Sequence, residues 1–90
     1  MIWREIGPGI EVAEYTEPGR DGPAGLLWRH PCPDDPRGPE NGGDAIPFGP
    51  PFDGQHWGLT SRDPLTLDGS LLCRACHLHG FIRDGKWEPA

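Results

Sequence analysis

The residues most able to do chemistry are three cysteines and two histidines, which lie in two short segments of the chain. Cys73, Cys76 and His79 follow one another at three-residue spacing, and the tripeptide His30-Pro31-Cys32 lies far upstream. A tight turn can aim thiolates and imidazoles with this spacing at one point, and these are the ligands that tetrahedral Zn²⁺ prefers. The pattern predicts a zinc site with five candidate ligands, namely His30, Cys32, Cys73, Cys76 and His79.

Five candidates compete for four coordination positions, and the residue types leave two arrangements open. Side chains two residues apart on a strand point the same way, which favours His30 and Cys32 together with Cys76 and His79. The Cys73-x-x-Cys76-x-x-His79 element equally favours three ligands from that segment and a fourth from Cys32. Either arrangement closes the coordination shell with protein ligands, so the expected zinc is structural.

The composition explains why a metal would be needed. Leu, Ile, Val and Phe make up only 17 of the 90 residues, Gly and Pro contribute 14 and 12, and the net charge is −6. Chains with so little apolar surface approach the disordered class, although four tryptophans spread along the sequence can each bury a large area. We expect one small domain over residues 1–90. Its hydrophobic core is small, and zinc binding would add on the order of 10 kcal/mol to its folding stability.

Alternating apolar residues predict strands at 10–16 and 26–30, joined as a hairpin. Shorter strands are expected at 55–59, 65–67 and 70–73, with one or two helical turns around 74–78. The strongest local signal is Asp84-Gly85, which favours a two-residue type I′ turn between 80–83 and 86–88 and pairs Ile82 with Trp87. The predicted fold is therefore mostly β, a small zinc-stabilised antiparallel domain with long Pro/Gly-rich loops and a C-terminal hairpin.

Residues 31–54 contain seven of the twelve prolines, and we expect them to form one long irregular loop. A loop of this length is usually functional or mobile. Its stiff run around Phe48 and Phe52, with His56 just beyond, could present aromatic side chains to a partner. The alternative is that the two phenylalanines fill the core.

Charge and hydropathy limit the expected partners. No apolar run is long enough to span a membrane, and the N-terminus lacks a signal pattern, so we expect a cytoplasmic protein. An odd number of cysteines suits metal ligands better than disulfides in that compartment. The chain has 14 acidic and 8 basic residues, with a single lysine, which makes a nucleic acid an unfavourable partner.

Residues 57–87, WGLTSRDPLTLDGSLLCRACHLHGFIRDGKW, resemble a family of small zinc-binding proteins found in phages of actinobacteria and other bacteria. The recurring pattern of that family is a tryptophan segment, a DxPTLxPSL stretch, a Cys-x-x-His or Cys-His element, and GFIRDGK. Its members begin with a short element that His30-Pro31-Cys32-Pro33 resembles. The chain departs from the pattern at Asp68-Gly69, where the family tends to have Ser-Pro. The resemblance implies a zinc-binding β domain in the cytoplasm of a bacterial host or in the virion, and implies no activity.

Three functions fit these observations. The leading interpretation is a non-enzymatic, zinc-stabilised protein-interaction module encoded by a phage. The second is an accessory structural component of a virion or other assembly. The third is a small zinc-dependent hydrolase or nuclease, which the sequence disfavours because the glutamate-containing motifs of zinc deaminases and zincins are missing. We therefore predict no catalytic residues.

Overall fold

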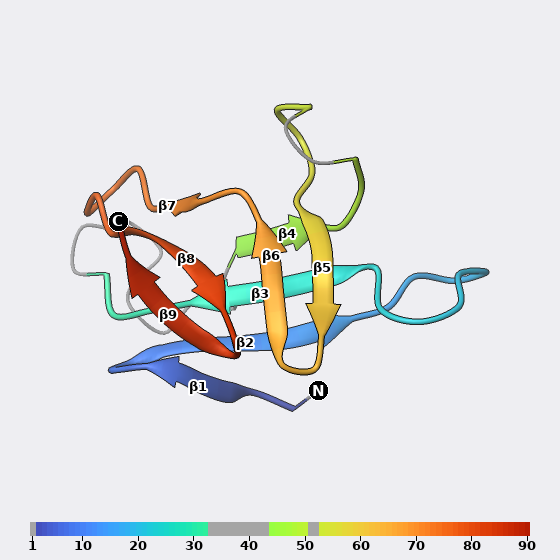
Figure 1. The fold of residues 1–90 in the computed structure, drawn as a ribbon, viewed down its shortest axis with the longest axis horizontal. Coiled ribbons are helices and arrows are strands. Elements are labelled where there is room, and N and C mark those ends of the chain that lie inside the picture. Colours follow the sequence, from blue (N-terminus) through green and yellow to red (C-terminus); the bar gives the residue numbers. More distant parts are fainter. Residues whose placement is uncertain (1, 33–43, 51–52) are drawn as a thin grey trace.

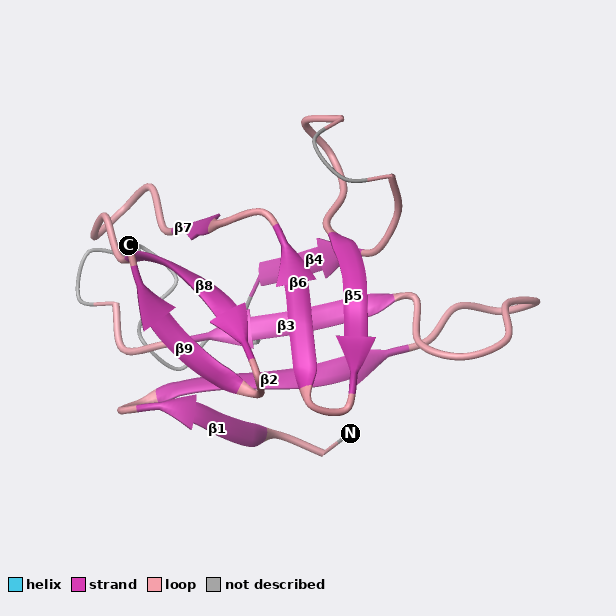
Figure 2. Ribbon diagram, in the orientation of Figure 1, coloured by secondary structure: helices cyan, strands magenta, loops and turns pink. Residues whose placement is uncertain are grey.

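The computed structural model describes residues 2–32, 44–50 and 53–90, and these residues form nine strands and no helix (Figures 1 and 2). Within these ranges, then, no helix is long and apolar enough to cross a membrane. All sheets are antiparallel, which confirms the predicted fold class. The strands are β1 (Arg4–Gly7), β2 (Ile10–Tyr15), β3 (Gly25–Arg29), β4 (Asp44–Pro47), β5 (Gly58–Arg62), β6 (Leu65–Asp68), β7 (Leu71–Leu72), β8 (His79–Arg83) and β9 (Lys86–Pro89).

The largest sheet has four strands in the order β1-β2-β3-β4. Strands β2 and β3 form the predicted hairpin, with Val12 opposite Trp28 and Glu14 opposite Leu26. Side chains two residues apart on a strand share a face, and the side of this sheet that carries Val12, Leu26 and Trp28 is buried. The sheet therefore supplies one wall of the core.

Two smaller sheets, β5-β6 and β7-β8-β9, cross the inner face of the larger sheet (Figure 1). Backbone contacts tie these sheets to one another and to β4. A parallel bridge joins Phe48 to Trp57 just before β5, and the amide of Gly85 donates to the carbonyl of Leu65 at 2.8 Å. All three sheets contribute side chains to one core, whose most deeply buried members are Val12, Leu26, Cys32, Ile46, Leu65, Leu71 and Ile82.

The C-terminal hairpin forms as predicted. Asp84 and Gly85 both have positive φ, at 52° and 75°, as a type I′ turn requires. Ile82 is paired with Trp87, and Arg83 with Lys86. Ile82 is fully buried and Trp87 is partly buried against the core, so the expected register and facing are both confirmed.

Two expectations about the middle of the chain are wrong. Residues 31–54 are not one irregular loop, because β4 lies within them and pairs with β3, placing Ile46 opposite Leu26. The strand expected at 55–59 begins at Gly58, and it pairs with β6. Both errors arose where a short strand carries few apolar residues and is held by a neighbouring strand, which local pattern does not reveal.

Candidate metal centre

The turn between β7 and β8 brings two cysteines of the C-terminal segment together. The carbonyl of Cys73 accepts a hydrogen bond from the amide of His77 at 2.7 Å, and the amide of Cys73 donates to the carbonyl of Leu78 at 2.8 Å. His77 adopts a positive φ of 65°, which reverses the chain into β8. This compact turn holds Cys73 and Cys76 on one side. The bond from His77 to Cys73 is that of one helical turn, as expected from the sequence, but it does not continue into a helix.

The other half of the centre follows β3. The strand ends at Arg29, and His30 and Cys32 come directly after it. The imidazole of His30 stacks on the indole of Trp28, with ring centroids 4.9 Å apart and an angle of 28° between the planes. Because Trp28 is itself buried in the core, this stacking fixes the direction of the His30 ring.

The two halves meet in a cluster formed by His30, Cys32, Cys73 and Cys76, whose candidate ligand atoms all lie within 4.8 Å of one another. His30 Nε2 is 3.4 Å from Cys76 Sγ, and Cys32 Sγ is 3.7 Å from Cys73 Sγ. A tetrahedron with Zn–S bonds of about 2.3 Å and Zn–N bonds of about 2.0–2.1 Å has edges of about 3.8 Å between sulfurs and about 3.6 Å between nitrogen and sulfur. The cluster could therefore hold a metal ion such as zinc with little rearrangement.

The backbone prepares Cys73 for the thiolate form that binds metals. Burial acts to raise the pKa of its thiol, but hydrogen bonds from the backbone amides of Cys76 and Ala75, and from the side chains of Cys76 and Cys32, act in the other direction. The hydrogen bonds prevail, and the pKa of Cys73 is lowered. Amide donors that face a sulfur stabilise its negative charge whether or not a metal is bound.

The structure brings together four of the five predicted ligands, in a combination that neither sequence-based arrangement contained. His79 lies outside the cluster, exposed on β8, with its ring 6.3 Å from that of Phe81. It is directly opposite Leu72, on the face of the sheet that points away from buried Ile82. The alternation of β8 could have signalled this placement, because His79 and Ile82 are an odd number of residues apart.

The aromatic residues expected to form a binding surface are differently placed. Phe48 is buried in the core with 7% of its surface exposed, as the core-filling alternative anticipated. Phe52 lies outside the described residues. His56 packs over Gly49, and its Nδ1 is 2.6 Å from Oδ2 of Asp53. The His56 side-chain hydrogen bond, followed by the backbone amide of Gln55, lowers the pKa of the Asp53 carboxyl to about 2.

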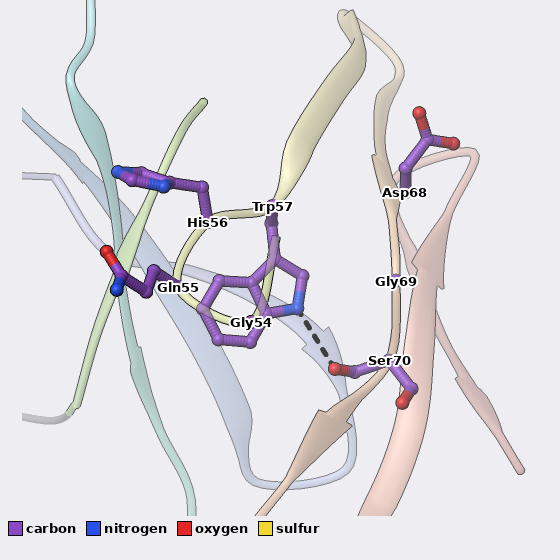
Figure 3. Close-up of a pocket in the computed structure, with 7 residues that line it drawn as sticks. All are labelled: Gly54, Gln55, His56, Trp57, Asp68, Gly69 and Ser70. Carbon is purple, nitrogen blue, oxygen red and sulfur yellow. Dashed lines mark hydrogen bonds between the residues drawn. The ribbon is translucent and has the colours of Figure 1, made fainter. Parts of the chain in front are cut away.

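His56 also lines a shallow pocket of about 260 Å³ between the start of β5 and the end of β6 (Figure 3). The indole of Trp57 occupies its centre, and its Nε1 donates to the carbonyl of Ser70 at 2.9 Å. The His56 ring points away from Ser70 (Figure 3), so the two do not form the nucleophile–base pair of a hydrolase.

Comparisons with protein-family models, with curated proteins and with solved structures found no match to this chain. The sequence resemblance to small phage proteins therefore remains a prediction, and the cluster itself is the main guide to function.

Proposed function

We propose that the cluster binds one Zn²⁺ as a closed structural site, and that the zinc-stabilised domain acts by binding another protein. The observation that carries the first part is the convergence of four ligand atoms from the segment after β3 and from the turn between β7 and β8. His30 and Cys32 follow β3 of the four-stranded sheet, and Cys73 and Cys76 precede the C-terminal hairpin of β8 and β9. Zinc would cross-link these parts of the fold.

The donor set supports zinc in a structural role. Three thiolates and one imidazole form a ligand combination common in structural zinc sites, and four protein ligands leave no position for a reactive water. Cys32 and Cys73 are buried, with 2% and 8% of their surfaces exposed, which keeps solvent from their side of the ion. A hydrolase would need an open coordination position, so this centre favours a structural role over a catalytic one.

Metal analysis tests this part directly. We expect the purified protein to contain one zinc per chain and to lose its near-ultraviolet circular dichroism when a strong chelator is added, because ligand binding and folding are coupled in small zinc domains. Adding zinc back to the chelated protein should restore the signal. A folded protein that contains no zinc, and that keeps its spectrum in chelator, would contradict the proposal.

Protein binding is supported by a row of exposed and partly exposed side chains on the outer face of β7 and β8. Leu72 has 52% of its surface exposed and lies opposite His79, while Phe81 follows on the same face with the guanidinium of Arg83 4.3 Å above its ring. Apolar and aromatic side chains flanked by charge are typical of interface cores. The phage setting of this role rests on the sequence resemblance.

A capture experiment tests the second part. The zinc-loaded protein, immobilised and exposed to lysate of phage-infected bacteria, should retain a defined protein, and Leu72→Asp should abolish that retention. Leu59→Asp is the matched control, because Leu59 is also exposed but lies on β5, in a different sheet. Equal retention by both variants would exclude this face as the binding surface.

A further inference from the structure

The cluster contains two thiols that are already placed for a covalent bond. Cys32 Sγ and Cys73 Sγ are 3.7 Å apart, and both residues are buried. A disulfide has an S–S distance of about 2 Å, so the sulfurs need to approach by less than about 2 Å. Rotation of the two side chains about their Cα–Cβ bonds is the movement that would close this gap.

The third thiol is less suitable for either alternative pairing. Cys76 is partly exposed, and its sulfur faces both His30 Nε2, at 3.4 Å, and the thiol of Cys73, to which it is hydrogen-bonded. A bond between Cys73 and Cys76 would close a loop within one turn and would leave the two parts of the fold unconnected. A bond between Cys32 and Cys73 joins residues 41 positions apart, and a longer loop restricts the unfolded chain more strongly.

We propose that Cys32 and Cys73 form a disulfide when the metal is absent. The segment after β3 and the turn between β7 and β8 can then be held together either by a metal ion or by a covalent bond. The oxidant is a peroxide. One thiolate attacks a peroxide oxygen and forms a sulfenic acid with release of water, and the other thiolate attacks that sulfur and releases the second water. In total, two thiols and one hydrogen peroxide give one disulfide and two waters. The inference deepens the proposed function because it concerns the same cluster, but it does not require the metal to be zinc.

The cysteine connectivity can be read by peptide mapping, because trypsin separates the three cysteines. Cleavage after arginine places Cys32 in peptide 30–37, Cys73 in peptide 63–74 and Cys76 in peptide 75–83. Full-length protein is treated with chelator and then with hydrogen peroxide, alkylated, and digested without reductant. We expect peptides 30–37 and 63–74 to be linked and peptide 75–83 to carry the alkyl group. The reduced, chelated protein should lack a cooperative thermal transition, and the oxidised, chelated protein should regain one, because the Cys32–Cys73 bond restricts the unfolded chain.

Variants separate this pairing from chance oxidation. Cys76→Ser cannot fold around zinc, as the chelated wild type cannot, but it keeps the proposed pair and should form the same linked peptides on oxidation. Cys32→Ser can form only the bond within the turn and should not regain the thermal transition. If Cys76→Ser does not refold on oxidation, the wild-type map still decides. A predominant link to peptide 75–83, a disulfide-linked dimer, or no disulfide would overturn the inference. If the protein binds no zinc but forms the Cys32–Cys73 bond, only the zinc proposal is contradicted. If it binds zinc but forms no Cys32–Cys73 bond, only the disulfide proposal is contradicted.

Discussion

The indole rings of Trp28 and Trp87 stack with their centroids 5.8 Å apart and their planes 15° apart, although they come from β3 and β9. Trp28 stacks in turn on His30, so a row of three rings leads from the C-terminal hairpin to the cysteine–histidine cluster. The aromatic contact and the candidate metal centre therefore hold the same junction between the four-stranded sheet and the hairpin.

Replacement of Trp87 by alanine tests how much the aromatic contact contributes to stability. We expect Trp87→Ala to lower the free energy of unfolding by about 3 kcal/mol, the lower end of the range for a large aromatic residue, because Trp87 is only partly buried. Trp87→Phe keeps a ring against Trp28 and should cost about 1 kcal/mol. Urea denaturation of the metal-loaded proteins measures both values, and equal stability of Trp87→Ala and wild type would show that the stack contributes nothing.

Substitution of single ligands separates the cluster from the excluded histidine. Cys76→Ser removes a thiolate from the cluster, and the chain should then lose zinc and fail to fold, because zinc binding worth on the order of 10 kcal/mol matches the whole stability of a small domain. His79→Ala should retain one zinc per chain and an unchanged near-ultraviolet spectrum. Elemental analysis and circular dichroism check both variants, and loss of zinc from His79→Ala would place that histidine among the ligands.

Local sequence patterns were sufficient for the two main hairpins. The alternation over Ile10–Tyr15 predicted the strand β2, which pairs with β3 as a hairpin. The Asp84-Gly85 dipeptide predicted both the turn and the register of the C-terminal hairpin. Strand β4 could not be predicted in this way, because Asp44–Pro47 contains one large apolar residue and ends in proline. Its position depends on β3, to which it adds as the last strand of the sheet, and such pairing is a tertiary property.

The site was predictable as a set of residue types and not as a geometry. The spacing identified candidates for a metal site, but no spacing rule specifies that Cys32 and Cys73 lie in contact. The exclusion of His79 depends on the positive φ of His77, which turns the chain before β8 begins. Few residues other than glycine adopt that conformation, although histidine is among the types that do so more often. The sequence therefore did not single out position 77 for the reversal, and only the alternation of β8 pointed to the placement of His79.

The C-terminal turn provides a test of backbone conformation. Gly85 has a φ of 75°, a region that a β-branched residue strongly disfavours, and we expect Gly85→Val to cost on the order of 2 kcal/mol or more. Gly85→Asn is the matched control, since asparagine tolerates this conformation, and it should cost well under about 1 kcal/mol. Thermal unfolding measures both variants. Equal melting temperatures would show that the turn does not have the type I′ geometry.

The remaining prediction concerns nucleic acid. We expect no measurable binding to duplex DNA at about 150 mM salt, because non-specific affinity comes from clustered cations that neutralise phosphates. Four basic residues, Arg29, Arg74, Arg83 and Lys86, lie near the cluster or in the C-terminal hairpin, and they are the ones most able to act together. Two of them are already occupied: Arg29 pairs with Glu11 at 3.2 Å, and Arg83 pairs with Glu88 at 2.6 Å.

Fluorescence anisotropy with a labelled duplex measures this binding. The control is the double variant Glu11→Gln/Glu88→Gln, because it removes the ion-pair partners of Arg29 and Arg83 and replaces each glutamate with a side chain of similar shape. Binding by the double variant alone would show that the ion pairs suppress an otherwise basic surface. Micromolar binding by the wild type that weakens steeply with added salt would contradict the prediction. It would also favour a nucleic acid over a protein as the partner, since the acidic net charge of −6 would then be outweighed by a local arrangement of cations.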